Sequence, residues 1–345
     1  MRHPIRRPAN QTAIARAAGV SVSTVSRALS NAPGISEARR AQIRQLAQES
    51  GYFGRSQGGG GTRALLTYVT SSMATGGLAP FYDAILKALT DSAKEAGLTL
   101  AVRLVDQASL DLKRVLRDTA AEPVVAVLLV GIDATEEIAV HCLNGPLKLL
   151  LVNGYDPQMR LDCVAPNNFF GGMMAAQRLL DAGHRSLLYV EDHIRWTTLQ
   201  RRRGFLAAIE GTPGARGSRI GIARDPDQVL AQEIERRRQG ATDWTGAFCV
   251  NDMSAIRLIG ALEAAGVSVP AEASVIGFDD LPYAAMMKPP LSTLAVDNVM
   301  IGRQAIALLL RRLAEPGAPA MQVECGVRME VGGTVAQLTQ NRDPD

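Results

Sequence analysis

The amino-acid sequence predicts an all-α helix-turn-helix head joined to an α/β body of two doubly wound parallel-sheet lobes. Three observations carry this prediction. Residues 11–30 hold two short helical patterns that meet at Gly19. From Arg63 onward, short apolar runs alternate with helical patterns, and this alternation occurs twice, as two βαβ lobes require. The first 63 residues are basic and the remainder is acidic, which indicates segments with different partners.

The first two helical patterns are expected to pack through small and branched side chains. Gly19 can adopt the left-handed turn conformation between them, and Ala15 is small enough for the second helix to cross closely. Ile14, Val20 and Val25 would form the shared core. Two short helices joined in this way are typical of a DNA-reading motif.

The second helix carries a hydroxyl-rich outer face, and Ser21 is placed to cap its N-terminus. The residues that we expect to contact DNA are Ser21, Val22, Ser23, Thr24, Ser26 and Arg27. Short hydrogen-bonding groups, a methyl surface and one guanidinium suit a major groove and its phosphates. An ordinary helix bundle is the alternative, but it would carry a mixture of Glu and Lys on this face, which the sequence lacks.

Charge is distributed unevenly along the chain. Residues 1–63 contain ten Arg, no Lys and two acidic residues, for a net charge of +8, so the rest of the +3 chain carries −5. This asymmetry indicates a polyanion partner for the basic segment. A third helical pattern begins at Ser36 and ends near Ser50. We therefore assign a three-helix DNA-binding head to residues 1–53.

Composition excludes several classes of protein. The 345 residues are 47% hydrophobic, which is enough for large cores. No apolar run approaches the roughly 20 residues that span a bilayer, and no apolar signal core follows the N-terminal arginines. We therefore expect a cytoplasmic protein without a membrane partner. The four Cys and four His residues lack metal-ligand spacing, so we expect no metal, cofactor or disulfide.

The body, residues 63–345, is expected to divide into two lobes. Lobe 1 spans about 63–160 plus 292–318, with strands at 64–69, 98–104, 124–130 and 147–152 and helices near 80–96, 110–119 and 135–143. Lobe 2 spans about 161–291 plus 319–345, with helices at 168–182, 197–210, 226–239 and 253–265 and strands at 186–190, near 220, at 247–250 and at 274–278. A last helix over 298–312 and short strands at 321–323 and 327–331 would complete the lobes.

Seven motifs follow one another along the chain: Val20-Ser21-Val22-Ser23-Thr24-Val25-Ser26-Arg27, Pro80-Phe81-Tyr82, Ala182-Gly183-His184-Arg185, residues 201–205, Asn251-Asp252-Met253, Val275-Ile276-Gly277-Phe278-Asp279-Asp280 and Pro289-Pro290-Leu291-Ser292-Thr293. In sequence and order they resemble the lactose and galactose repressor family of bacterial transcription regulators, over essentially the whole chain. The resemblance implies a homodimer whose two heads grip a pseudo-palindromic double-stranded DNA operator. It also implies a body of the periplasmic-binding-protein type I kind that closes on a small-molecule effector.

The resemblance also distributes roles over the second helix. Val22, Ser23 and Arg27 would reach base edges, while Ser21, Thr24 and Ser26 would contact phosphates. Arg27 can donate two hydrogen bonds to a guanine, worth about 1–3 kcal/mol of discrimination, and Val22 can pack on a thymine methyl. Ser23 is too short to specify much, and a surface serine without a base contact is an equally open interpretation.

The linker, residues 54–62, departs from the family pattern. Family members usually form a short hinge helix here that inserts a leucine into the minor groove. This segment is about one turn short, has no aliphatic residue, and contains Gly58-Gly59-Gly60-Gly61, whose ordering in a helix would cost about 4 kcal/mol. We therefore expect a flexible tether and weaker control of DNA affinity by the effector. A linker without regulatory meaning stays open.

A two-lobed body predicts an effector cleft between the lobes, at the carboxyl ends of the strands. The residues expected to line it, by chemistry and by the family's pocket positions, are Phe81, Tyr82, Asn153, Asn168, Arg195, Trp196, Thr197, Arg201, Asn251 and Asp279. Carboxylate, guanidinium and amide groups pair with vicinal hydroxyls, and aromatic faces cover apolar sugar surface, so a sugar is the expected effector. A core aromatic pair at Phe81 and Tyr82, a solvated Arg201 and an N-cap role for Asn251 are the alternatives.

No catalytic residues are assigned. The glycine run lacks the Gly-Lys-Ser/Thr ending of a phosphate loop, and no nucleophile has a base nearby in the sequence. The expected function is an effector-responsive transcription regulator, most simply a repressor of carbohydrate-related genes. Two alternatives stay open: a corepressor-dependent regulator of the purine type, and a two-lobed sugar-binding or sugar-processing protein with a vestigial head.

Overall fold

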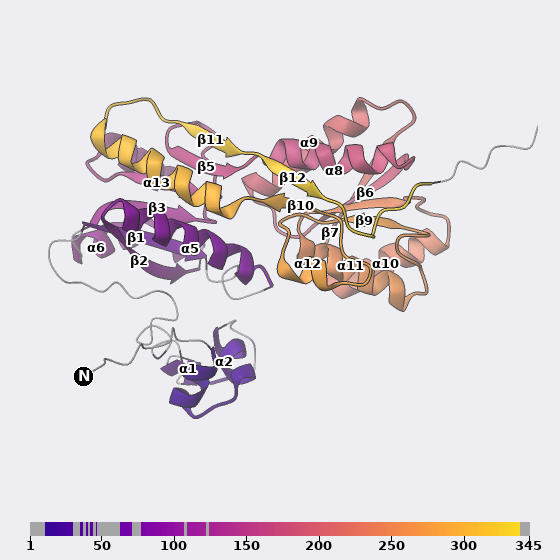
Figure 1. Cartoon of the computed structure of the whole chain (residues 1–345), viewed down its shortest axis with the longest axis horizontal. Helices are drawn as coiled ribbons and strands as arrows, with labels where there is room; N and C mark the ends of the chain where they lie inside the picture. Colours follow the sequence, from indigo (N-terminus) through magenta and orange to yellow (C-terminus); the bar gives the residue numbers. More distant parts are fainter. Residues whose placement is uncertain are drawn as a thin grey trace, which may run out of the picture. The chain divides into compact units, whose positions relative to one another are not determined.

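The structure is a computed structural model, and it describes residues 11–29, 35–36, 39–40, 42–43, 46, 63–70, 77–106, 109–121 and 124–338 (Figure 1). The linker 54–62, on which the tether hypothesis rests, lies outside these residues. Among the helices that are described, none is long and apolar enough to cross a membrane. All four cysteines are buried free thiols.

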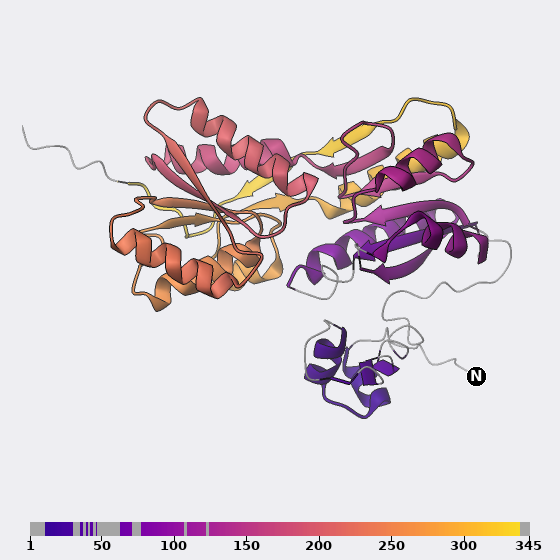
Figure 2. The same cartoon turned by 180° about the vertical axis from the view of Figure 1, so that it is seen from behind.

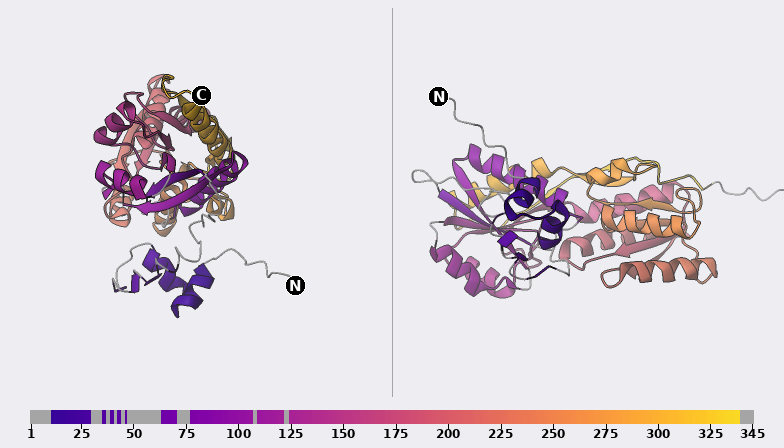
Figure 3. Two further views of the ribbon diagram at one scale, coloured as in Figure 1. Left: turned by 90° about the vertical axis from the view of Figure 1, so that its left-hand side faces the viewer. Right: turned by 90° about the horizontal axis from the view of Figure 1, so that it is seen from below.

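The head contains α1 (Gln11–Ala18) and α2 (Val22–Leu29), which pack against each other (Figures 1 and 3). Gly19 takes a φ of +63° in the turn between them, as its lack of a Cβ allows. Ile14 and Val25 are fully buried and Val20 packs beside them, so the predicted core is confirmed. Most of the predicted third helix lies outside the described residues, but 39–40, 42–43 and 46 are helical and Ile43 joins the same core.

The chain forms two compact units, residues 1–163 with 302–321 and residues 164–301 with 322–345. The predicted lobe 1 included residues 292–301, which the structure groups with unit 2. The reason is a long-range pairing: β10 (Thr293–Val296) forms an antiparallel ladder with β12 (Val327–Glu330). Residues 319–321 belong instead to unit 1, where the Cys163 amide donates to the Met321 carbonyl.

Unit 1 contains four neighbouring strands of a sheet, in the order β4-β3-β1-β2. Its elements are β1 (Arg63–Thr70), α5 (Ala79–Glu95), β2 (Leu98–Val105), α6 (Leu112–Ala121), β3 (Val124–Val130), α7 (Glu136–Asn144), β4 (Leu149–Val152) and the start of β5 (Asp162–Pro166). Strands β2, β1, β3 and β4 pair in parallel. The final helix α13 (Asn298–Ala314) enters this unit at Gly302, whose missing side chain lets it approach Ala88 of α5.

Unit 2 contains a parallel sheet with the order β7-β6-β8-β9. Its elements are α8 (Asn168–Asp181), β6 (Ser186–Glu191), α9 (Trp196–Glu210), β7 (Arg216–Gly221), α10 (Pro226–Arg238), β8 (Gly246–Cys249), α11 (Asp252–Ala264), β9 (Ser274–Ile276), α12 (Pro282–Met286), β10, β11 (Gln322–Cys325) and β12. Helices α8 and α9 cover one face of the sheet, and α10 and α11 cover the other (Figures 1 and 2).

The alternation along β6 explains these two layers. Leu187 and Tyr189 join the core under α8 and α9, whereas Leu188 and Val190 join the core under α10 and α11. The predicted α/β body with parallel sheets is therefore confirmed. Strands β5 and β10 and helix α12, each at most five residues long, were not predicted.

Candidate DNA-reading and ligand-binding sites

The second helix of the head presents the predicted reading face. The Ser21 hydroxyl accepts a hydrogen bond from the Thr24 amide at 3.1 Å and lies 2.8 Å from the Thr24 hydroxyl, so Ser21 is the N-cap of α2. Val22 is 43% exposed and Arg27 is exposed, while Val25 and Ala28 on the inner side are fully buried. The side chains of Ser23 and Ser26 lie outside the described residues. The described part of the face thus carries an apolar group and a guanidinium.

Arg201 is the centre of a buried polar network in unit 2. Its Nε donates to Asn168 Oδ1 at 2.8 Å, one terminal nitrogen donates to the Val250 carbonyl at 2.5 Å, and the other contacts Asp279 Oδ1 at 3.3 Å. The guanidinium carbon lies 3.5 Å from the centre of the Phe278 ring. The side chains of Arg201 and Asp279 are only 6% and 5% exposed, so this arginine is not part of a solvated face.

The backbone places Asp279 where this contact can form. Asp279 follows β9 with a φ of +110°, and Asp280 has a φ of +54°. Both values lie in regions that non-glycine residues rarely adopt, and such conformations gather at binding and catalytic sites. Burial raises the pKa of Asp279 to about 6, although the Arg201 charge opposes the shift.

A second buried carboxylate, Asp252, was missed in the sequence. It accepts hydrogen bonds from the Leu281 amide at 2.7 Å and from the Thr293 hydroxyl at 2.5 Å. Burial, and then the nearby charge of Asp279, raise its pKa to about 8. The one sequence signal for Asp252 was its position directly after the predicted site residue Asn251. Its partner Thr293 lies 41 residues away in the chain, so the sequence did not show that the two side chains meet.

The remaining predicted residues of unit 2 have mixed roles. Asn251 accepts a hydrogen bond from the Ser254 amide at 2.8 Å, which is the N-cap role weighed as its alternative. Thr197 and Arg195 are buried, at 2% and 8% exposure. Trp196 lies 5.0 Å from the guanidinium of Arg203, which is an apt partner for its ring face.

Unit 1 holds the other three predicted residues together. Phe81 and Tyr82, at the start of α5, meet edge to face with ring centres 5.2 Å apart. The Asn153 side-chain amide donates to the Tyr82 hydroxyl at 3.3 Å. A Cβ at Gly131 would lie 2.5 Å from the Tyr82 ring, so glycine is needed there. Both aromatic side chains are at most 4% exposed, as expected for a core pair.

Two family models match the chain. The model described as bacterial regulatory proteins, lacI family, matches residues 12–54, and the periplasmic binding protein-like domain matches residues 176–335. The chain thus carries a lacI-family head and a periplasmic binding protein-like domain. The first match contains α2 and all of α1 except Gln11, and the second contains Arg201, Asn251 and Asp279. The family resemblance read from the sequence is therefore confirmed.

The similarity to known proteins extends over most of the chain. The HTH-type transcriptional regulator GalR of Salmonella typhimurium is 28% identical over 306 residues, which are 86% of this chain and 87% of GalR. The structure of a transcriptional regulator CelR–cellobiose complex matches 94% of this chain and 99% of that chain, with a TM-score of 0.68 and 20% identity. The structure of the lac repressor dimer bound to operator and the anti-inducer ONPF matches 96% of this chain and 100% of that chain, with a TM-score of 0.67 and 19% identity. The two structures show a shared fold.

Proposed function

We propose that this lacI-family chain is a sequence-specific DNA-binding transcription regulator, a repressor of carbohydrate-related genes, whose operator affinity changes when a small effector binds. The observation that carries the proposal is the outer face of α2, where Val22 and Arg27 are exposed on a helix capped by Ser21. An exposed apolar group and guanidinium on a helix of this kind can read base edges in a major groove. Such a protein acts in the cytoplasm, where the DNA is, and we assign it no catalytic role.

A homodimer on a pseudo-palindromic operator is part of this proposal. One small head supplies few contacts, whereas specific recognition needs a larger interface. The fold shared with a lac repressor dimer bound to operator supports this arrangement. We propose Ser21, Thr24 and Ser26 as phosphate contacts and Val22, Ser23 and Arg27 as base contacts.

We further propose that the Arg201 network binds the effector, and that the effector is a sugar. The network offers a carboxylate acceptor at Asp279 and donors at Arg201, which is the chemistry that vicinal hydroxyls require. The Arg201–Asp279 contact, at 3.3 Å, is the longest in the network, so a ligand hydroxyl can bridge it with little loss. The shared fold with the CelR–cellobiose complex supports this effector class.

We also propose the other predicted residues as effector contacts. They are Phe81, Tyr82, Asn153, Arg195, Trp196, Thr197 and Asn251, together with Asn168, which already accepts from Arg201. Tyr82→Phe tests the unit 1 group, because it keeps the ring and removes only the hydroxyl that accepts from Asn153.

Selection of fragmented genomic DNA tests the reading function. The purified protein is incubated with fragments of its own genome at physiological salt, and the retained DNA is sequenced. We expect a palindromic site that Arg27→Ala no longer enriches, while Arg224→Ala, in unit 2, still enriches it. Retention without sequence preference by the wild-type protein would contradict sequence-specific reading.

Calorimetric titration tests the effector. A sugar panel and a purine panel are titrated into the wild-type protein and into Asp279→Asn, with operator affinity measured in parallel. We expect a sugar to bind, to lower operator affinity, and to lose affinity in the variant. Purine binding that raises operator affinity would favour the corepressor alternative. A protein that binds a sugar but binds no operator sequence would favour the sugar-binding protein with a vestigial head.

A further inference from the structure

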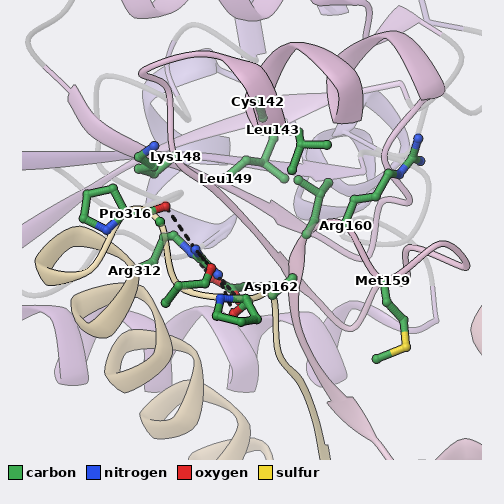
Figure 4. A pocket seen from close by; sticks show the side chains of 14 residues that line it. Cys142, Leu143, Lys148, Leu149, Met159, Arg160, Asp162, Arg312 and Pro316 are labelled. Carbon is green, nitrogen blue, oxygen red and sulfur yellow. Dashed lines mark hydrogen bonds and ion pairs between the residues drawn. The ribbon is translucent and has the colours of Figure 1, made fainter.

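Unit 1 contains a cavity of about 380 Å³ that no predicted effector residue lines (Figure 4). It lies at the start of β4, beside the last turn of α7 and the segment that follows α13. Its size is within the range of small-molecule sites. Strand β4 runs from the cavity residue Leu149 to Val152, and Asn153, a predicted effector residue, follows at the far end, about 13 Å away by strand geometry. The cavity is therefore separate from the proposed effector residues.

One wall of the cavity is fixed by a buried ion pair. Arg312 donates to both oxygens of Asp162, at 2.6 and 2.9 Å, and Asp162 also accepts from the Met321 amide. The remaining guanidinium hydrogens reach the carbonyls of Pro316, Ala318 and Pro319. These bonds hold the segment after α13 in place, so the cavity does not depend on a ligand for its shape.

The floor of the cavity is apolar. Cys142, Leu149 and Leu161 line it and are each less than 7% exposed. Leu143 and Met159 line the rim and are 54% and 58% exposed, so they extend the apolar surface toward the solvent. Figure 4 shows Leu143 and Leu149 between Lys148 on one side and Arg160 on the other.

Lys148 is the cation of this cavity that has no carboxylate partner among the residues that the structure describes. Arg312 is occupied by Asp162, and Arg160 is occupied by Asp156 and Glu136. The Lys148 ammonium makes a long contact, 3.5 Å to the Gly145 carbonyl. Lys148 and Cys142 both line the cavity. Burial raises the pKa of the Cys142 thiol to about 11, and the positive charge of Lys148 opposes this shift.

We propose that this cavity binds a small organic monocarboxylate, whose carboxylate pairs with Lys148 and whose compact apolar part covers Leu149 and Leu161. An ammonium beside an apolar floor matches an amphipathic anion better than a neutral sugar or a bare inorganic anion. The carboxylate gains a charge-assisted hydrogen bond, and the apolar part leaves water. This ligand site is additional to the effector site proposed in unit 2.

Fluorine-observed NMR of the full chain tests the site, with 4-fluorobenzoate as the probe and 4-fluorobenzamide as its neutral isostere. We expect the benzoate to bind and the benzamide to bind at least about tenfold more weakly, because it cannot form the charge-assisted bond. Lys148→Met keeps the apolar stem and should weaken benzoate binding by about the same factor. Lys113→Met, an exposed lysine of α6, is the matched control and should bind benzoate like the wild type.

A second variant separates the cavity from the charge. Ala320→Phe adds a ring to a residue that lines the cavity, and it should abolish benzoate binding while the unfolding midpoint is kept. Asp279→Asn should leave benzoate binding unchanged, whatever it does to sugar binding. Equal binding of benzoate and benzamide, full binding by Lys148→Met, competition by inorganic phosphate at similar concentration, or no benzoate binding at all would each overturn the proposal.

Discussion

The head and unit 2 present their candidate functional side chains in opposite ways. On α2, Val22 is 43% exposed and Arg27 is exposed, and the core is made by other residues, such as Val25. In unit 2, Arg201 and Asp279 are buried and already bonded to each other and to Asn168.

This difference separates two ways of building a binding site. The head divides folding and reading between two sides of one helix, so a reading residue can change without a change in stability. In unit 2 the same atoms hold the unit together and face the proposed ligand. Substitutions there should therefore alter stability and binding at the same time, whereas substitutions on the outer face of α2 should alter binding alone.

The largest effect is expected from Arg201→Met. The variant removes the guanidinium and leaves Asp279 and Asn168 buried without their partner, and breaking a buried ion pair in this way costs about 3–5 kcal/mol. Urea unfolding followed by the fluorescence of Trp196 and Trp244, both in unit 2, measures the loss.

Two further variants make this test specific. Arg203→Met changes an exposed arginine on the same helix, whose contact with the Trp196 ring is worth about 1 kcal/mol or less. Arg201→Met combined with Asp279→Asn removes both charges and should recover part of the stability. An Arg201→Met protein that unfolds at the wild-type urea concentration would show that the network does not hold unit 2 together.

The second effect is a dependence of stability on pH. Asp252 has a pKa of about 8 in the folded protein and about 4 when unfolded, so the folded state binds more protons between these values. The free energy of unfolding should then fall as pH rises from 5 to 8, by up to about 1.4 kcal/mol for each pH unit. Asp279, with a pKa of about 6, contributes in the same direction at the lower end.

Asp252→Asn checks the origin of this slope. Asparagine keeps the shape and an acceptor for the Leu281 amide but does not titrate in this range. Urea titrations at several pH values should give a slope at least halved in the variant. Equal slopes for both proteins would assign the dependence to other groups.

Local signals and long-range pairing explain how much the sequence could predict. The head was predictable because Gly19 and Ser21 each act within a few residues of their own position. The main strands and helices of both units were predictable from periodicity. Strand β10 was not, and nothing in the sequence indicated that it would pair with the predicted strand β12, more than 30 residues away.

The candidate ligand site shows the same limit. Family pocket positions pointed to Arg201, Asn168 and Asp279, and the structure brings these three together. The sequence could not show that their groups are already bonded, or that Val250 and Phe278 complete the network, because those contacts join four separate elements. The cavity beside Lys148 had no sequence signal, because its walls come from segments that are about 170 residues apart.

The third effect is expected in the head, where Arg27→Ala should change binding alone. Loss of a bidentate guanine contact costs about 1–3 kcal/mol, or roughly 5- to 150-fold in affinity for the selected operator. Fluorescence anisotropy measures this loss against a scrambled duplex, whose affinity should fall far less. The unfolding midpoint should match that of the wild type, and a clear loss of head stability would break the contrast between the head and unit 2.

The smallest effect is expected from Ser21→Ala. Ser21 caps α2 and is also a proposed phosphate contact, so this variant tests whether folding and DNA binding are separate everywhere in the head. The Thr24 amide loses its acceptor, so the end of α2 should be destabilised by about 1 kcal/mol. Hydrogen exchange of that amide should then be about fivefold faster.

Ser21→Asn supplies another capping oxygen and should restore protection of the Thr24 amide. If the cap is all that Ser21 provides, Ser21→Asn also restores operator affinity; if Ser21 contacts a phosphate as proposed, affinity stays low on every DNA sequence while the helix end is intact. Low affinity with an intact helix end would place capping and phosphate binding on one hydroxyl, and Ser21 would then combine a structural and a binding role, as we propose for Arg201.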